Sequence, residues 1–245
     1  MTPAAAEFDQ FRHTYRQDLQ SSLALTGGDV DFFTQVKAQV LIDLCRRGGG
    51  DPLSQRGLDV GCGVGLTDAH LAGRVGALDG VDISSGSIQA AARANPWVRY
   101  RTYDGGALPY DDGAFDFAFA ICVFHHVPLS ARGPLASEMA RVVRPGGLVV
   151  IMEHNPFNPL TQYIVAECPF DRTAQLLPMY ASRRLVEDQG LRIVHDDFIL
   201  IFPFRGRWFR AIEHKLRRAP LGAQYCVAGQ VPAGGRGASR GGGDR

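Results

Sequence analysis

Short apolar stretches alternate with helix-like stretches across residues 57–153, and this alternation limits the chain to few folds. Strands and helices that alternate in this way form right-handed crossovers between parallel strands, and the helices cover both faces of the sheet. The strand-like runs are 57–60, 78–82, 98–103, 115–121 and 148–153, and the helix-like stretches between them are 66–75, 84–94 and 135–143. The sequence therefore predicts an α/β fold with a doubly wound, mostly parallel sheet.

The flanking regions complete the predicted sheet. Runs 191–202 and 223–229 are two more strand candidates, which gives a seven-stranded sheet with an antiparallel C-terminal edge strand. Asp29 is a plausible cap for a helix that extends to residue 46, with its apolar residues at helical spacing. The motif RPGG (144–147) predicts a tight turn directly before the fifth strand.

Composition excludes several kinds of protein. Lys and Arg number 26 against 25 Asp and Glu, so the net charge of +1 provides no overall field that favours nucleic acid or an anionic membrane. The five cysteines form an odd, widely spaced set without a C-x-x-C pair, which argues against a disulfide framework and a structural zinc site. The N-terminal stretch lacks the apolar core of a signal peptide, so a cytoplasmic location is expected.

A glycine-rich turn follows the first predicted strand, in the stretch LDVGCGVG (58–65). Gly61 and Gly63 match the first two positions of the dinucleotide fingerprint G-x-G-x-x-G, but the third glycine comes early, at Gly65, and Leu66 stands at the sixth position. Glycines at the exit of a strand let a ligand approach bare backbone and its free N–H donors. Such a turn also occurs for structural reasons alone, so the neighbouring strand ends must decide between the two interpretations.

Acidic residues end the next two predicted strands. Asp82 lies 21 positions after Gly61, where a carboxylate can accept both hydroxyls of a ribose, and Asp104 ends the third strand in the same way. A surface acid and a turn-forming Asp before Gly105 are the structural alternatives. Because the carboxyl ends of parallel strands meet at one edge of a sheet, we expect these groups to line one crevice.

The chain resembles the class I, Rossmann-like, S-adenosylmethionine-dependent methyltransferases of the small-molecule type 11/12 group. The matching stretches are LDVGCGVG (58–65), GVDIS (80–84), YDGGALPYDDGAFDFAFAICVFHHV (103–127) and RVVRPGGLVVIMEHNPF (141–157). The resemblance implies S-adenosyl-L-methionine as cofactor. It further implies a Rossmann-like domain over 51–228 and an N-terminal helical cap or lid over 1–50. The length and composition of the stretch after the fifth strand predict an acceptor-site insertion at 154–180, and the glycine-rich, polar composition of 229–245 predicts a disordered tail.

The resemblance also assigns cofactor-binding residues. The glycine turn would cradle the methionine part, Asp82 would hold the ribose, Asp104 would bind the adenine amine, and backbone after the fourth strand would meet the amino-acid end. Lys37, or Tyr15 before it, would close over the cofactor. The predicted cofactor-binding set is Asp59, Gly61, Cys62, Gly63, Gly65, Asp82, Ile83, Asp104, Gly105, Ala120 and Lys37.

Four residues near the crevice are candidates for proton removal from the methyl acceptor, namely His125, His126, Glu153 and His154. An imidazole titrates near neutrality, which suits removal of a proton from a hydroxyl or an ammonium group. A structural alternative for the histidine pair is a cap on the turn before Pro128. His13, His70, His195 and His214 are scattered without metal-binding spacing, so no metal site is predicted.

Two further segments bear on the acceptor. Phe157, Tyr163 and Phe170 of the 154–180 insertion would form an apolar wall of the acceptor site, or alternatively pack in the core. Residues 204–222 form a basic amphipathic helix that would contact a membrane surface or a lipid-linked acceptor, or pack on the sheet. The NPF at 155–157 lacks the second proline of the amino-methyltransferase motif and follows the wrong strand, so no nucleic-acid partner is expected.

The leading hypothesis is therefore methyl transfer to an O or N atom of a small molecule, such as a sugar, a lipid-linked compound or a specialised metabolite. One alternative is an NAD(P)-dependent oxidoreductase, which the displaced third glycine and the position of Asp104 disfavour. The other is a non-catalytic, cofactor-binding partner subunit. The identity of the acceptor and the oligomeric state do not follow from the sequence.

Overall fold

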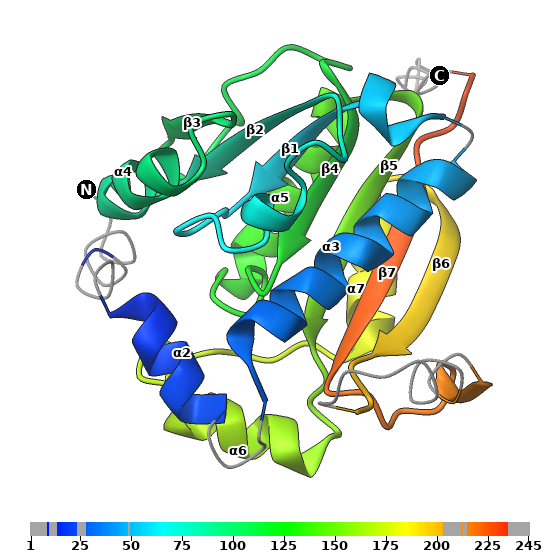
Figure 1. The fold of residues 1–245 in the computed structure, drawn as a ribbon. Coiled ribbons are helices and arrows are strands. Elements are labelled where there is room, and N and C mark those ends of the chain that lie inside the picture. Colours follow the sequence, from blue (N-terminus) through cyan, green and yellow to red (C-terminus); the bar gives the residue numbers. More distant parts are fainter. Residues whose placement is uncertain are drawn as a thin grey trace, which may run out of the picture.

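A seven-stranded sheet forms the centre of the computed structural model, which describes residues 9, 14–23, 28–48, 50–202, 212 and 215–234 (Figure 1). The strands are β1 (Arg56–Val60), β2 (Ala77–Asp82), β3 (Arg99–Thr102), β4 (Phe115–Ile121), β5 (Val143–His154), β6 (Arg192–Ile199) and β7 (Gln224–Gln230). Their order is β3-β2-β1-β4-β5-β7-β6, and β1 to β5 are mutually parallel. The predicted α/β fold with a mostly parallel sheet is confirmed.

The C-terminal strand β7 runs antiparallel to both of its neighbours, β5 and β6. It lies one position in from the edge of the sheet, which β6 occupies. Pairing along β7 continues through Gln230, and Val231 is buried. The predicted start of the tail at residue 229 is therefore wrong by a few residues, because β5 and β6 supply backbone partners up to Gln230. The rest of the predicted tail, residues 235–245, lies outside the described part of the chain.

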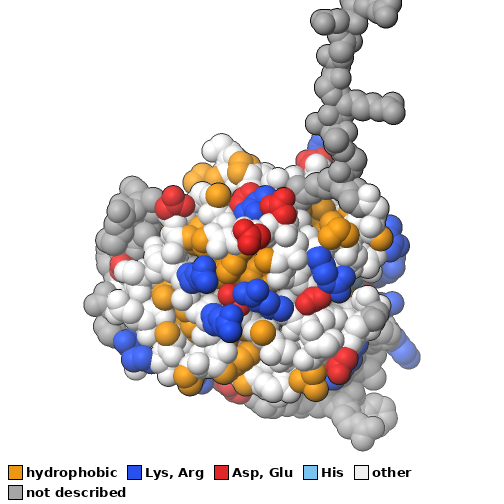
Figure 2. Space-filling view, turned by 90° about the horizontal axis from the view of Figure 1, so that it is seen from above, with side chains coloured by type: hydrophobic (Ala, Val, Ile, Leu, Met, Phe, Trp, Pro, Cys, Tyr) orange, Lys and Arg blue, Asp and Glu red, His pale blue; other side chains and the backbone are white. Residues whose placement is uncertain are grey.

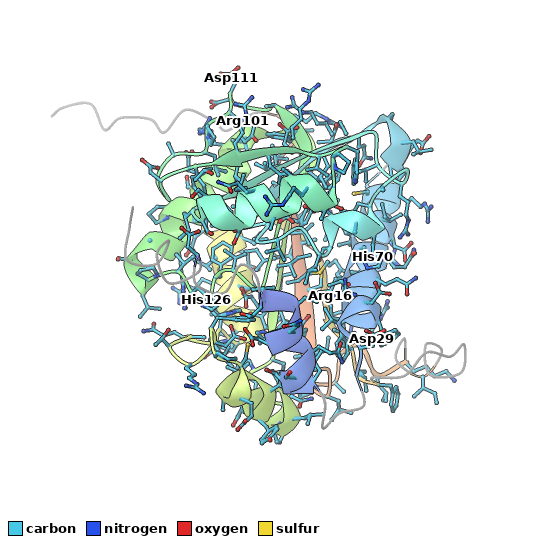
Figure 3. The ribbon with its side chains drawn as sticks, turned by 60° about the vertical axis from the view of Figure 1, so that its left-hand side comes forward. Arg16, Asp29, His70, Arg101, Asp111 and His126 are labelled. Atoms are coloured by element: carbon cyan, nitrogen blue, oxygen red, sulfur yellow. The ribbon has the colours of Figure 1, made fainter. Side chains whose placement is uncertain are left out.

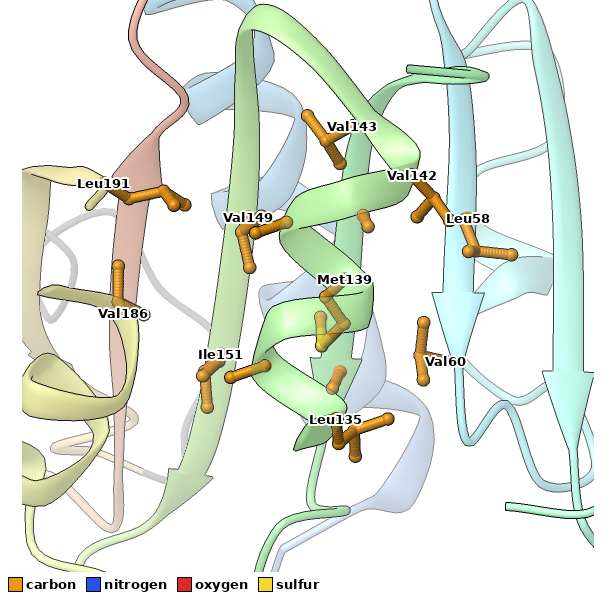
Figure 4. Packing of buried hydrophobic residues seen from close by; sticks show 14 of the residues in the cluster. Leu58, Val60, Leu135, Met139, Val142, Val143, Val149, Ile151, Val186 and Leu191 are labelled. Atoms are coloured by element: carbon orange, nitrogen blue, oxygen red, sulfur yellow. The ribbon is translucent and has the colours of Figure 1, made fainter. Parts of the chain in front are cut away.

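Two helices, α5 (Leu129–Val142) and α7 (Met179–Glu187), cover one face of the sheet. Figure 4 shows Leu135, Met139 and Val142 of α5 directed at the side chains of β1 and β5. Met139 and its sheet partner Ile151 are fully buried. Burial of side chains of this size contributes about 1.5–3 kcal/mol each, so this cluster is a main source of stability.

Helix α3 (Val30–Arg47) covers the opposite face of the sheet. Asp29 caps it as predicted, accepting a hydrogen bond from the Asp31 N–H at 3.1 Å. Leu41 and Ile42 are fully buried and belong to the same cluster as Phe117 and Phe119 of β4. The division predicted at residue 50 therefore cuts through one hydrophobic core. Helix α2 (Tyr15–Leu23) lies away from the sheet, beside α6 (Pro159–Glu167) (Figure 1).

Two local predictions differ from the structure. Residues 66–75 form turns around the short 3-10 helix Asp68–His70 instead of a full helix, and Gly73 has a left-handed φ of +67° that interrupts any helix there. The RPGG motif lies within β5, where the pairing with β4 shifts between Phe115 and Phe117. In contrast, helix α4 (Ser85–Ala94) is capped as predicted. The Ser84 hydroxyl accepts a hydrogen bond from the Ser87 N–H at 3.0 Å. A short 3-10 helix, Pro52–Ser54, precedes β1.

Charges at the amino ends of the strands are paired. Arg56 binds Asp79 at 3.0 Å and Arg144 binds Asp116 at 2.6 Å. The space-filling view from above shows Lys and Arg side chains interspersed with Asp and Glu on this face (Figure 2). Among the described residues, no helix is both long and apolar enough to cross a bilayer.

Candidate active site

A cavity of about 280 Å³ opens at the carboxyl ends of β1, β2 and β4. This is the edge at which ligands bind in open α/β sheets. Its lining comes from segments far apart in the sequence, which include α2, the glycine turn, the turn after β4 and the segment around Phe170. In Figure 3, His126 lies at the level of α2, far from Arg101 and Asp111 at the other end of the molecule.

The glycine turn presents bare backbone to this cavity. The N–H groups of Gly61 and Cys62 donate to the carbonyl of Val81, which fixes the turn against β2. Gly61 has a φ of +76°, and a Cβ there would lie 2.6 Å from Val123. At Gly63, with a φ of +53°, a Cβ would meet no protein atom within 4 Å. The space beside Gly63 therefore belongs to the cavity, and the turn fits a ligand that approaches the backbone closely.

Asp82 is the carboxylate held nearest to this turn. Its two oxygens accept hydrogen bonds from the N–H groups of Gly63 and Ser84, each at 2.8 Å, and the side chain lines the cavity. Burial raises the pKa of Asp82, while those backbone donors oppose the rise. From the N-terminal segment, Asp9 accepts hydrogen bonds from the Ser84 hydroxyl at 2.5 Å and the Gly86 N–H at 3.0 Å, so that this segment reaches the same end of the site.

Asp59 also lines the cavity, but it interacts with a second carboxyl group. Burial, and then the neighbouring Asp68, raise the pKa of Asp59 well above its usual range. Burial likewise raises the pKa of Asp68 to about 6, although the Tyr100 hydroxyl donates to it at 2.6 Å. The second oxygen of Asp68, Oδ1, is buried without a hydrogen-bond partner. These observations fit one proton shared by Asp59 and Asp68 at neutral pH.

Most of the predicted cofactor-binding residues line this cavity, and three do not. The lining includes Asp59, Gly61, Cys62, Gly63, Asp82, Ile83, Gly105 and Lys37. Gly65 instead faces Asn95, whose Nδ2 donates to its carbonyl at 2.9 Å. Ala120 is buried in the core, and its neighbours Ile121 and Cys122 line the cavity in its place. Asp104 is exposed and accepts from the Gly106 N–H at 2.9 Å, which is the turn arrangement considered as its alternative.

The predicted catalytic residues come together in one buried cluster. Glu153 lies behind the cavity wall, where its Oε1 accepts from the N–H groups of Val123 and Phe124 at 2.9 and 2.7 Å. Its Oε2 is 2.5 Å from His125 Nδ1. Burial alone would raise the pKa of Glu153, but His125 outweighs it and holds that pKa below its usual range. Glu153 therefore positions His125, while His125, His126 and His154 line the cavity.

Asp171 joins this cluster, and the sequence prediction missed it. Its Oδ1 lies 3.1 Å from His126 Nε2 and 3.4 Å from His125 Nε2. Burial opposes ionisation, but these neighbouring histidines hold the pKa of Asp171 well below its usual range. Burial lowers the pKa of His154 to about 4, so this ring is neutral at physiological pH. A single Asp beside Phe170 carries no spacing signal, which is why only the structure identifies it.

The turn after β4 carries backbone strain at the site. Cys122 has a φ of +57°, a backbone conformation that a residue with a side chain seldom adopts. Where such residues occur, they cluster at functional sites. The Cys122 N–H donates to the Met152 carbonyl at 2.8 Å, and the Gln224 amide lies 3.3 Å from the Cys122 sulfur. These contacts hold the turn so that Val123, His125 and His126 face the cavity.

Aromatic residues close one side of the cavity. The ring of Tyr15 on α2 stacks on that of Phe170, with centroids 4.5 Å apart. Phe170 is therefore where the apolar wall was predicted, whereas Phe157 and Tyr163 are 63% and 42% exposed and do not line the cavity. Helix α6 turns Tyr163 outward, because its buried residues are Thr161 and Val165, and Phe157 precedes this helix.

Comparisons with known proteins agree with this geometry. Residues 58–151 match the model of the family described as "Methyltransferase domain". The 2-methyl-6-phytyl-1,4-hydroquinone methyltransferase of Synechocystis sp. is 33% identical over 129 residues, which are 50% of this chain and 40% of that protein. The phosphatidylethanolamine N-methyltransferase of Cereibacter sphaeroides is 33% identical over 147 residues, which are 57% of this chain and 71% of that protein.

The fold is shared with solved structures. An S-adenosylmethionine-dependent methyltransferase from Thermotoga maritima superposes with a TM-score of 0.63 at 16% identity, over 93% of this chain and 99% of that chain. This likeness concerns the fold alone. The chain spans 40% or less of the length of several curated relatives that it matches.

Proposed function

The chain belongs to the class I S-adenosylmethionine-dependent methyltransferases, and from this premise we propose that it transfers a methyl group from S-adenosylmethionine to a small-molecule acceptor. The cavity supports the proposal, because it joins the glycine turn and Asp82 to a separate polar cluster around His125. When bound, S-adenosylmethionine supplies an electrophilic methyl group, so the main task of the protein is alignment.

Each group at the glycine end has a binding role in this proposal. Asp82 accepts hydrogen bonds from the ribose hydroxyls, and the backbone at Gly63 lies against the methionine part. Lys37 is 9% exposed and lines the cavity close enough to Asp59 to affect its ionisation, so its ammonium group is placed to bind the cofactor carboxylate. The open space beside Gly63 is the observation that best supports a ligand at this point.

The acceptor side of the cavity combines apolar walls with one polar cluster. Leu19, Val127, Leu135 and Phe170 provide apolar surface, and His126, His154 and Asp171 provide the polar groups. This arrangement suits an apolar acceptor with a single O or N nucleophile directed at the cluster. We propose that His125, held by Glu153, orients that atom, and that His126 and His154 are the nearest groups to take up its proton.

Calorimetry with S-adenosylhomocysteine tests the cofactor site. Asp82→Ala removes charged hydrogen-bond acceptors worth about 1.5–3 kcal/mol each, so we expect binding to weaken by roughly tenfold to a hundredfold or more. Asp112→Ala is the matched control, because its side chain is 82% exposed and lies outside the cavity. Equal binding by both variants would refute the assignment, and tight NAD(P) binding without S-adenosylhomocysteine binding would restore the oxidoreductase alternative.

Turnover requires a second experiment. Incubation of the protein with a metabolite extract and a methyl donor labelled at the methyl group should transfer the label to a small molecule. Tight cofactor binding without transfer to any acceptor would favour a non-catalytic partner subunit. The relatives named above are a quinol methyltransferase and a phospholipid N-methyltransferase, so hydroquinones and amino lipids belong in the acceptor panel.

We also propose contact with an anionic lipid surface. Phe157, Leu160 and Leu221 are exposed, and the Asn158 amide donates to the Leu221 carbonyl at 2.8 Å, which places these apolar groups side by side. Lys215 and Arg218 are exposed nearby along the chain; most of the predicted basic helix at 204–222 lies outside the described residues. Vesicles containing phosphatidylserine should sediment the wild type but not a Phe157→Ser, Leu160→Ser variant, and equal sedimentation would contradict the contact.

A further inference from the structure

Three side chains at the acceptor end of the cavity converge as metal ligands do. His125, His154 and Asp171 each offer a ligand atom, and these atoms all lie within 4.8 Å of one another. They come from the turn after β4, the end of β5 and the segment before α7, so three separate parts of the fold bring them together. We infer that His125, His154 and Asp171 form a binding site for one divalent transition-metal ion.

The surroundings of His125 prepare it to be a ligand. Glu153 is fixed by two backbone N–H groups and lies 2.5 Å from His125 Nδ1, so Nδ1 faces this carboxylate and Nε2 lies on the opposite side of the ring. That Nε2 is buried without a hydrogen-bond partner and faces Asp171. A carboxylate behind a histidine in this way is the usual outer-shell arrangement of metal-binding histidines.

The distances also fit an ion. His125 Nε2 and Asp171 Oδ1 are 3.4 Å apart, which is about the edge of a tetrahedron around an ion that is about 2.1 Å from each ligand atom. His126 Nε2, 3.1 Å from the same oxygen, orients the Asp171 carboxylate. The ligand atom of His154 lies within 4.8 Å of the ligand atoms of His125 and Asp171. Two imidazoles and one carboxylate favour zinc, iron or cobalt over magnesium and calcium, which prefer oxygen ligands.

Charge balance agrees with a divalent cation. Glu153 and Asp171 place two carboxylates in the buried cluster, and within the described part of the chain their ion pairs come from imidazoles alone. Buried carboxylates need compensation, and a divalent ion would provide it in place of the protons on the histidine rings.

The ion would also narrow the class of acceptor, an inference that rests on the proposed function. A coordination position left open toward the cavity can take an acceptor hydroxyl, whose pKa a bound metal lowers. The acceptor would then be a phenol or enol: its proton leaves to solvent or His126, the oxygen lone pair forms the O–CH₃ bond, and the S–CH₃ bond breaks with its electrons remaining on sulfur. An O-methylated product and S-adenosylhomocysteine result.

Metal binding is measured directly on tag-free full-length protein. After treatment with chelator and dialysis against Zn²⁺ or Co²⁺, we expect one ion per chain by elemental analysis, and visible d–d absorption of the Co²⁺ form. Asp171→Asn and His154→Ala remove ligands and should each weaken binding by at least about a hundredfold, whereas Glu153→Gln, behind the ligand, should weaken it by about tenfold to a hundredfold. His195→Asn is the matched control, since His195 lies 3.5 Å from Asp197 on another part of the sheet and should bind metal as the wild type does.

The outcomes separate this inference from the proposed function. S-adenosylhomocysteine binding by Asp171→Asn should persist and shows that the variant is folded. Absence of stoichiometric metal from the wild type, or equal metal binding by wild type, Asp171→Asn and His154→Ala, would overturn the metal site and leave the cluster as a metal-free proton relay. Loss of binding in His195→Asn as well would show that the ion is held elsewhere, which also overturns the assignment.

Discussion

At the scale of single residues, the carboxyl pair of Asp59 and Asp68 is the most unusual feature of the site. Both side chains are buried, and the Asp68 Oδ1 atom without a partner is explained by a proton on Asp59. With one proton between them, Asp59 and Asp68 together carry a single negative charge. The glycine turn therefore lies beside less negative charge than two aspartates suggest. The pair therefore fixes the end of the first strand while Asp82 remains the main carboxylate at the ribose position.

This pair makes stability depend on pH. The pKa of Asp68 is raised from 3.8 to about 6, so between these values the folded protein keeps a proton that the unfolded chain has lost. The free energy of unfolding therefore falls as the pH rises through this window. In Asp68→Asn the amide can donate to Asp59 and still accept from Tyr100. As the pH rises, the free energy of unfolding of this variant should therefore fall by less than that of the wild type, with a difference on the order of 1–3 kcal/mol.

Urea unfolding at pH 4.5 and pH 7 of wild type and Asp68→Asn measures this difference, because titrating groups outside the Asp59–Asp68 pair cancel between the two proteins. Asp112→Asn, at an exposed carboxylate, should follow the wild type. Parallel pH profiles for wild type and Asp68→Asn would show that the two carboxyl groups do not share a proton.

At the scale of elements, the glycine turn can be separated into its structural and its binding roles. Gly63 and Gly73 both have left-handed φ values, +53° and +67°, and a Cβ at either would meet no protein atom within 4 Å. Gly63→Ala and Gly73→Ala should each destabilise the protein by about 1–2 kcal/mol through backbone strain. Because only Gly63 lines the cavity, only Gly63→Ala should also weaken S-adenosylhomocysteine binding, by tenfold or more.

Thermal unfolding and calorimetry on the two variants measure both effects. Similar melting temperatures with unequal affinities are the expected result. If Gly73→Ala lost affinity as strongly as Gly63→Ala, the effect would come from general loosening of the turn and not from space beside Gly63.

The elements also show which predictions the sequence could support. Helix α3 and the strands β1 to β4 have clear periodicity and were predicted close to their observed bounds, whereas β5 begins five residues earlier than the predicted 148. The stretch 66–75 has a helix-like apolar pattern, but Gly73 and the buried Asp68 favour turns, and only the tertiary contact with Tyr100 reveals why. Asp171 and the Tyr15–Phe170 stack depend on segments that meet across the fold, so no local pattern could indicate them.

At the scale of the whole molecule, the alternation of strands and helices was sufficient to predict the sheet, and the carboxyl-end rule placed the site. Contacts across the site come from α2, the turn after β4 and the segment around Phe170. A ligand in this cavity therefore connects distant parts of the chain and should stabilise the fold as a unit.

S-adenosylhomocysteine at about 100 times its dissociation constant should stabilise the protein by about 2.7 kcal/mol. For a chain of 245 residues this corresponds to a rise in melting temperature of about 5–10 °C. Asp82→Ala at the same ligand concentration should show a much smaller rise. A large rise with NAD(P) and none with S-adenosylhomocysteine would contradict the proposed cofactor.

The most direct measurement is a crystal structure of the protein with S-adenosylhomocysteine. We expect the ribose hydroxyls within hydrogen-bond distance of the Asp82 carboxylate, the amino-acid part against the Gly63 backbone, and the sulfur facing the side of the cavity that holds His126, His154 and Asp171. A molecule bound outside this cavity, or one bound inside it without contact to Asp82, would contradict the proposed cofactor site.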